Sequence, residues 1–238
     1  MFKKTVIAGA LGLAISATAQ ADYRWQVDAN AGRTNIDIGR DDGDVDQFGV
    51  GGRFYFKDVD TSKGPLGEAS FLDHSSYVGA GYQYTDLDDI IEDVDGDTYG
   101  IGGRYVLPLE SIPLIFEADW TRETPDFSDI DFYRIGFGAY ITDNTTVVLS
   151  YRTSDVDETN DIDPGDIDAY SIDVKHLWHL SGDGAITLEG SYGLIEVDDN
   201  NINDGDDIDS WKIGGTWYVN KNLGFSADFS RFDNFGIE

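Results

Sequence analysis

The sequence predicts an all-β protein, an antiparallel up-and-down transmembrane β-barrel of eleven strands. Three observations predict this fold. From residue 23 onward, short segments alternate apolar and polar residues with a period of two, which is typical of strands with two different faces. Every second segment repeats one aromatic and mostly glycine-rich pattern, and the connections alternate between short turns and longer acidic stretches. These features indicate one hairpin used repeatedly.

The N-terminal stretch has the three parts of a secretory signal peptide. Two lysines come first, an apolar run from Val6 to Ile15 follows, and the small-residue triplet Ala19-Gln20-Ala21 closes it. We therefore expect residues 1–21 to be a signal peptide and residues 22–238 to form one barrel domain. The apolar run is shorter than the roughly 20 residues of a transmembrane helix, and no later segment approaches that length. Helical membrane spans are not expected.

The odd-numbered strands are expected to run from the periplasmic end and to carry one apolar and one polar face. In the first of them, Tyr23, Trp25, Val27 and Ala29 share a face. The six predicted ranges are 23–37, 76–86, 114–122, 145–153, 185–197 and 223–232.

The even-numbered strands carry an internal repeat, in which an aromatic residue is followed two positions later by Val or Ile, mostly with glycines between and after them. Copies begin at Phe48, Tyr99, Tyr133 and Trp211, and a looser copy begins at Tyr170. Such a repeat is compatible with a propeller, an array or a barrel, so the connections have to separate these folds.

The connections alternate in length and charge. Those after even strands are short, at 108–113, 142–144, 181–184 and 220–222, with one longer exception at 58–70. The five connections after odd strands hold 28 of the 46 acidic residues and no Lys or Arg; they are 41–46, 86–97, 123–131, 155–168 and 198–209. In a meander all five lie at one end, which is the asymmetry of an outer-membrane barrel. A soluble two-sheet sandwich fits the strands but not this one-sided charge.

Aromatic side chains lie toward the strand ends, as the interfacial belts of a membrane barrel require. The predicted aromatic belt contains Trp25, Trp120, Trp178, Trp211 and Trp217.

The connection from Val59 to Leu72, and above all its part from Thr61 onward, resembles a segment of the general porin family of gammaproteobacteria. The signal peptide, the acidic connections and the hairpin rhythm extend this resemblance over most of the chain. It implies a pore-forming outer-membrane protein and names no solute. Outer-membrane barrels have an even number of strands, whereas this chain stops at Phe235-Gly236-Ile237-Glu238. We therefore expect a truncated sequence that lacks a twelfth strand.

The strand phase that turns Phe48 and Val50 toward lipid turns a set of charged residues inward. The predicted pore-lining residues are Arg53, Arg104, Arg134, Arg152, Lys175, Lys212, Glu117, Asp119, Glu189 and Asp228. Two interpretations stay open: a hydrated constriction, and an internal ladder of ion pairs that closes a narrow barrel. Inward glycines such as Gly51 and Gly102 either leave room for a hydrated pore or relieve strand curvature.

The formal net charge of −30 makes nucleic acid or an anionic lipid surface an unfavourable partner. The absence of cysteine excludes disulfides and thiolate metal sites. A ring of carboxylates at the mouth should concentrate cations, so we expect a cation-preferring channel for passive diffusion of small hydrophilic solutes or ions. The alternatives are a structural or loop-presenting barrel with a closed lumen, and acids that only solvate the surface or bind divalent ions bridging lipopolysaccharide.

No enzymatic activity, cofactor or dedicated metal site is expected. The three histidines have no evident serine and carboxylate partners, and the stretch from Asp93 to Asp97 lacks the spacing and closing Glu of an EF-hand. The expected partners are outer-membrane lipid, lipopolysaccharide and small solutes or cations, at the cell outer membrane, and a homo-oligomer is left open.

Overall fold

A computed structural model describes residues 22–38, 41–88, 94–125, 129–156, 167–197 and 208–234. It contains eleven antiparallel strands, each paired with the next along the chain, so the predicted up-and-down meander is confirmed. The strands are β1 (Tyr23–Ile38), β2 (Asp41–Val59), β3 (Tyr77–Asp88), β4 (Val94–Leu107), β5 (Leu114–Pro125), β6 (Ile130–Thr142), β7 (Thr145–Val156), β8 (Ile167–His179), β9 (Ala185–Val197), β10 (Ile208–Asn220) and β11 (Leu223–Asn234).

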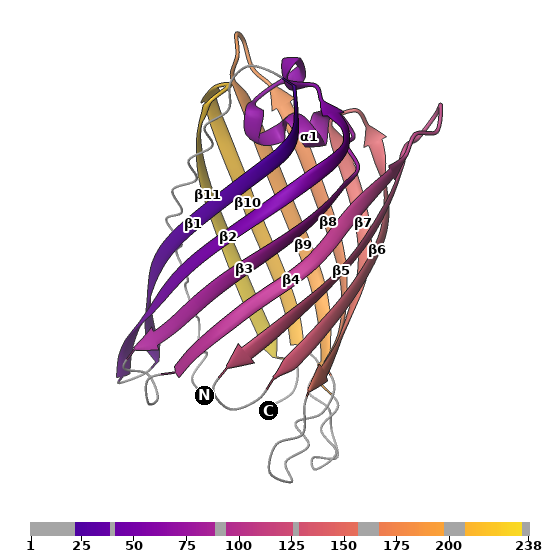
Figure 1. Ribbon diagram of the computed structural model, residues 1–238. Coiled ribbons are helices and arrows are strands. Elements are labelled where there is room, and N and C mark those ends of the chain that lie inside the picture. The colour runs from indigo at the N-terminus through magenta and orange to yellow at the C-terminus, as the bar shows by residue number, and fades with distance from the viewer. Residues whose placement is uncertain are drawn as a thin grey trace.

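The sheet curls around a central lumen (Figure 1). Among the described residues β1 and β11 each have one strand neighbour, so the sheet is not closed by pairing between them. The predicted signal peptide lies outside the described residues. The twelfth strand, expected after Glu238, lies outside them as well.

The short connections form tight turns at one end of the sheet, at the top of Figure 1. Between β10 and β11, the Asn220 side chain accepts hydrogen bonds from the backbone N–H groups of Asn222 (2.8 Å) and Leu223 (3.1 Å), which reproduces a turn with a side chain. Between β8 and β9, Gly182 has φ of 77°, a conformation that glycine adopts without steric cost. These two turns reverse the chain direction after β8 and β10, so that the following strand runs antiparallel.

The strands run further into the acidic stretches than the sequence predicted. Residues 41–46, expected as a connection, belong to β2, and residues 94–97 belong to β4. Asp and Gly disfavour strands in isolation, but the ladder between β1 and β2 continues to the pair Ile38 and Asp41. Cross-strand pairing therefore outweighs the local propensity. Other parts of the acidic stretches, such as residues 89–93 and 157–166, lie outside the described residues.

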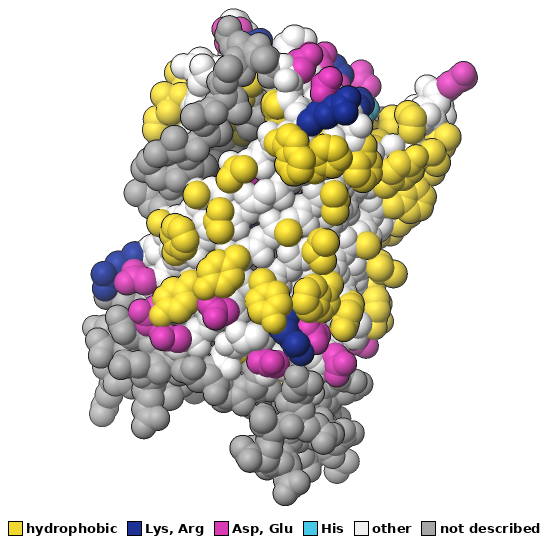
Figure 2. Space-filling model, viewed as in Figure 1, with side chains coloured by type: hydrophobic (Ala, Val, Ile, Leu, Met, Phe, Trp, Pro, Cys, Tyr) yellow, Lys and Arg dark blue, Asp and Glu magenta, His cyan; other side chains and the backbone are white. Residues whose placement is uncertain are grey.

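The outer face of the sheet is apolar and exposed. Trp25 (70% exposed), Val27 (71%) and Ile135 (63%) are examples, and Figure 2 shows hydrophobic side chains forming a band over the strands, with acidic side chains beyond its lower edge. A water-soluble sandwich would bury these side chains, so this alternative is excluded. No described helix has the length and hydropathy of a membrane span.

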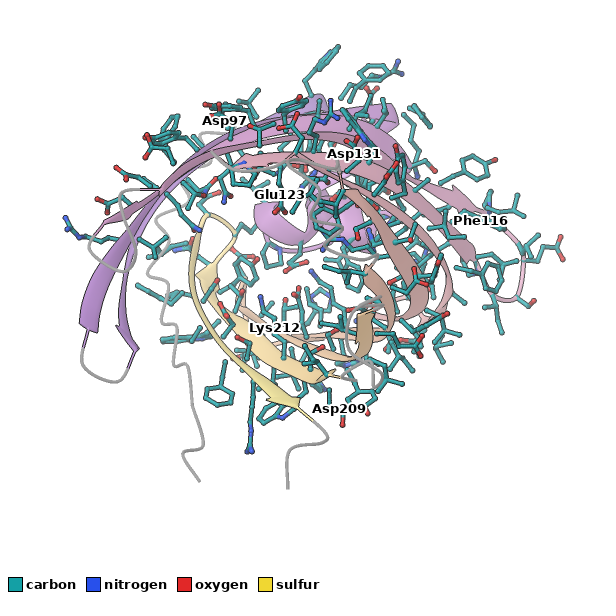
Figure 3. The ribbon with its side chains drawn as sticks, turned by 90° about the horizontal axis from the view of Figure 1, so that it is seen from below. Asp97, Phe116, Glu123, Asp131, Asp209 and Lys212 are labelled. Atoms are coloured by element: carbon teal, nitrogen blue, oxygen red, sulfur yellow. The ribbon has the colours of Figure 1, made fainter. Side chains whose placement is uncertain are left out.

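The connection between β2 and β3 folds inside the ring of strands (Figure 3). It contains two 3₁₀ turns, η1 (Thr61–Lys63) and η2 (Leu66–Glu68), and one short helix, α1 (Ala69–Leu72). Its buried side chains form the core clusters of the described structure with inward residues of β2 and β4–β9. We call residues 60–76 the plug. The sequence predicted a longer connection here, at 58–70, but did not predict that it enters the lumen.

Candidate pore lining and inner plug

The predicted pore-lining residues lie on the strands and gather around two overlapping cavities. A cavity of about 450 Å³ is lined by Arg53, Glu117, Asp119 and Arg134 among others. A second cavity, of about 510 Å³, is lined by Arg53, Arg104, Glu117, Arg134, Lys175, Glu189 and Lys212 together with plug residues. Neither cavity includes Arg152 or Asp228, which nevertheless pair with Glu123 and Lys212 respectively. In Figure 3, Lys212 and Glu123 point into the lumen, whereas Phe116 points away from it.

One group of lumen charges forms a tight network across β4, β5 and β6. Glu117 lies between two arginines, with Arg104 Nη2 at 2.5 Å and Arg134 Nη1 at 3.2 Å from its oxygens, and Arg134 Nε also donates to Asp119 at 2.7 Å. The Glu117 side chain is only 8% exposed. Close charge-assisted hydrogen bonds of this kind brace neighbouring strands. This part of the lumen matches the interpretation as an internal ladder.

Glycines of the even strands make room for these carboxylates. Gly102 lies directly opposite Asp119 in the register, and a Cβ on Gly102 would lie 2.6 Å from the Cβ of Asp119. Gly136 lies opposite Glu117, and a Cβ there would lie 3.2 Å from its Oε2. These inward glycines of β4 and β6 therefore allow the acids of β5 to turn toward the arginines.

A second group of lumen charges forms long ion pairs and is exposed to solvent. Arg53 and Asp28 are 3.9 Å apart, Lys212 and Asp228 are 3.7 Å apart, and Arg152 is 4.0 Å from Glu123. All six side chains are between 42% and 58% exposed. Exposed pairs at such distances contribute little to stability, so these groups can exchange protein partners for water or ions. This part of the lumen matches the interpretation as a hydrated constriction.

The plug is attached to the lumen wall through Glu68. Its carboxylate is 6% exposed; Oε1 accepts from Thr187 and Tyr218 at 3.1 Å each, and Oε2 lies 2.9 Å from Lys175 Nζ. Lys175 also pairs with Glu189 at 2.7 Å. Sequence reasoning identified Lys175 and Glu189 but missed Glu68, because the strand alternation that assigns a face does not extend into the plug.

A second buried carboxylate fastens the plug to itself and to β2. Asp73 accepts from Lys63 Nζ at 2.6 Å and Ser75 Oγ at 3.0 Å, and Lys57 Nζ lies 3.1 Å away. Burial by itself disfavours the charged form of Asp73. The hydrogen bonds from Lys63, Lys57 and Ser75 outweigh that effect and hold the pKa of Asp73 below its usual value.

The five tryptophans of the predicted belt divide between the two ends of the strands. Trp25 lies near the start of β1, and Trp178 and Trp217 lie near the ends of β8 and β10, so these three lie toward the turn end. Trp120 and Trp211 lie toward the acidic end. Membrane barrels carry aromatic residues at two interfacial levels, and the belt stays a prediction for this chain.

The histidines take part in packing at the turn end. His176 shares a hydrogen bond with Thr145 Oγ1 (2.7 Å) and packs against Trp178, and His74 bonds to the backbone oxygen of Asp143 (3.1 Å). Within the described ranges no group of three or more His, Cys, Asp or Glu side chains could hold a metal ion.

One family model and one solved structure are similar to the chain. Residues 1–168 match the model of a family described as "Putative general bacterial porin", which confirms the resemblance seen in the sequence. Among solved structures, the chain is similar to the outer membrane protein Omp33 of Acinetobacter baumannii, with 21% identity, a TM-score of 0.44 and coverage of 92% of this chain and 100% of that one. No curated protein matches the chain.

Proposed function

The chain belongs to the general bacterial porins of the outer membrane, and on this premise we propose that its lumen carries small hydrophilic solutes and ions by passive diffusion, with a preference for cations. The observation that carries this proposal is the set of three exposed, loosely paired charge pairs in the lumen. Arg53 with Asp28 and Lys212 with Asp228 lie on strands at either edge of the sheet, and Arg152 with Glu123 lies toward the acidic end. Exposed charges whose opposite charge lies about 4 Å away can replace part of the water shell of a passing ion.

The expected preference for cations rests on the acidic end. We infer that this end faces the exterior, because outer-membrane barrels keep their short turns in the periplasm. Carboxylates concentrated at one mouth create a negative potential that extends over about 8 Å at physiological ionic strength. That potential raises the local concentration of cations before they reach the mixed charges of the lumen.

The reversal potential of the chain in a planar bilayer, under a potassium chloride gradient, tests this proposal. We expect a sign that corresponds to potassium passing more readily than chloride. A variant with Asp28 and Asp228 both replaced by Asn should shift the reversal potential toward chloride. A chloride preference of the unaltered chain, or the absence of any conductance, would contradict the proposal.

A second candidate function is a barrel with a closed lumen that serves the envelope structurally, and the plug favours it. The plug contacts the inner wall from β2 to β10, so it fills much of the turn end. Replacing residues 61–75 with a short Asn-Gly turn separates the candidates. If the unaltered chain is silent and the variant conducts, the closed barrel is supported; conduction by both supports the channel. Shortening the connection at 108–113, at the same end, is the matched control.

A further inference from the structure

An outward-facing aspartate precedes the aromatic residue of every copy of the strand repeat by two positions. The five residues are Asp46, Asp97, Asp131, Asp168 and Asp209, on β2, β4, β6, β8 and β10. Since residues two apart share a strand face, each aspartate lies on the same outer face as the aromatic residue that follows it. Figure 3 shows Asp97 and Asp209 on the outer side of the ring of strands.

Each of these aspartates contacts a donor on the preceding odd strand. Four of the donors are aromatic: Tyr82 bonds to Asp97 (2.5 Å), Trp120 to Asp131 (3.0 Å), Tyr151 to Asp168 (2.8 Å) and Tyr192 to Asp209 (2.6 Å). The fifth contact is an ion pair, in which Arg33 Nε lies 3.6 Å from Asp46. We call these five aspartates and their donors the outer polar ring.

The register explains why the contact recurs. Each aromatic donor is the direct cross-strand partner of the repeat's leading aromatic: Tyr82 of Tyr99, Trp120 of Tyr133, Tyr151 of Tyr170 and Tyr192 of Trp211. The ring of Tyr151 packs against that of Tyr170, with centroids 5.2 Å apart, and the ring of Trp120 packs against Tyr99 of the preceding strand at 5.9 Å. In each of the four cases the polar tip of the donor reaches the aspartate two residues before its cross-strand partner. An aromatic residue with one apolar and one polar end suits the boundary between hydrocarbon and headgroups.

The position of the outer polar ring matches the edge of an apolar span. On β6, Asp131 is followed on the outer face by Tyr133, Ile135, Phe137, Ala139 and Ile141, and the next acid of that phase is Asp143. On β2, Asp46 and Asp58 bound the same interval. Twelve residues of a strand tilted by about 40° rise roughly 30 Å, which is close to the thickness of a bilayer's hydrocarbon core.

We propose that the outer polar ring docks on the polar headgroup layer of the leaflet at the acidic end and fixes the depth of the barrel in the membrane. Lipid headgroups fit this surface because its carboxylates accept from ammonium and hydroxyl groups. Arg33 and Arg122, which also pairs with Asp131 at 3.0 Å, present guanidinium groups to phosphates. Moving the ring into hydrocarbon would desolvate five carboxylates, whereas moving it outward would expose the aromatic band.

Spin labels on single cysteines test the proposal, because the chain has no native cysteine. One label replaces Ile101, which faces outward and lies four residues from Asp97 toward the middle of β4. The other replaces Val219, near the turn end of β10. Their depths are measured by power saturation in short-chain and long-chain phosphatidylcholine bilayers. We expect the Ile101 label to keep its distance from the headgroup layer at the acidic end. The Val219 label should change its distance from the headgroup layer at the turn end. Equal movement of both labels would overturn the proposal.

A variant with all five aspartates replaced by Leu gives an independent result. It lengthens the apolar span by about 5 Å along the membrane normal, as two further residues do on a tilted strand. We expect the Ile101 label to move several ångströms toward the bilayer centre. Replacing the aspartates with Asn keeps polar acceptors and should leave the label nearer its original depth. Replacing the lumen-facing Glu123 with Leu is the matched control, and an unchanged depth in the folded Leu variant would refute the proposal.

Discussion

Two carboxylates of the lumen illustrate how different the roles of similar residues can be. Glu117 is 8% exposed and held between two arginines, whereas Asp228 is 42% exposed and lies 3.7 Å from a single lysine. Removing one partner of a buried ion pair leaves the other charge uncompensated and costs about 3–5 kcal/mol. Breaking an exposed pair costs about 1 kcal/mol or less. Stability and permeation should therefore depend on different residues of the same lumen.

The pair of variants Glu117→Gln and Asp228→Asn separates these effects. We expect Glu117→Gln to lower the free energy of unfolding by about 3 kcal/mol, because Arg104 and Arg134 lose their shared partner. Asp228→Asn should leave the free energy of unfolding within about 1 kcal/mol and reduce the cation preference. Urea titration followed by electrophoretic mobility measures the first quantity, and the reversal potential measures the second. A stability loss of equal size in both variants would contradict this assignment.

At the scale of the elements, sequence reasoning predicted the strands well and the plug poorly. A period of two fixes the face of every strand residue once one residue of that strand is assigned, so Arg53, Arg104 and Lys175 could be predicted to face inward and do line one cavity. No such periodicity exists between Asp60 and Ser76. The partners of Glu68 are Lys175, Thr187 and Tyr218, more than a hundred residues away. Only the curled sheet brings them together.

The outer polar ring was also missed, for a different reason. The charge pattern predicts that Asp97 and Asp209 belong to acidic connections, whereas both lie in strands. Their regular spacing of two residues before the aromatic was present in the sequence. Its role can be inferred only from the register, which shows that the hydrogen-bond donors lie on the preceding strand, opposite the leading aromatic residues.

The plug should respond to acid through Asp73. Its carboxylate has a pKa below the ordinary value of 3.8, so the stabilisation it provides is complete above that value and is lost as the pH falls through the lowered pKa. We expect the plug to remain attached from neutral pH down to about pH 4 and to loosen in more acidic solution. The measured quantity is the single-channel conductance between neutral pH and about pH 3, which should rise at the acidic end of that range.

Asp73→Asn removes the ionised partner of Lys57 and Lys63 at every pH. The variant should show a raised conductance at neutral pH and a smaller increase on acidification. Asp183→Asn, on the exposed turn between β8 and β9 at the same end, is the matched control. If Asp73→Asn kept the neutral conductance and the full acid response of the unaltered chain, the attachment of the plug would not depend on Asp73.

At the scale of the whole molecule, charge and apolar surface are separated in two directions. Across the wall, apolar side chains face outward and charged side chains face the lumen, as expected where strands cross a bilayer. Along the axis, all odd strands before β11 end at the same end of the sheet, and the sequence places most of its acids next to those strand ends. The lumen mixes both signs, so we expect any net preference among ions to arise mainly at the acidic mouth.

Selectivity that arises at an exposed mouth depends on salt, because exposed charges are screened by the ions they attract. The screening length is about 8 Å at 0.15 M and about 3 Å at 1 M ionic strength. In dilute salt a passing ion would therefore be attracted by the carboxylates of the acidic mouth across much of the opening. In concentrated salt the attraction would act only at close contact. We expect the potassium preference to fall several-fold between these conditions in reversal-potential measurements at a constant concentration ratio. Asp228→Asn should lower the preference at both concentrations, since Asp228 acts at short range inside the lumen. A preference that stays constant across this range in the unaltered chain would place the selecting charges within the lumen and refute the role of the mouth.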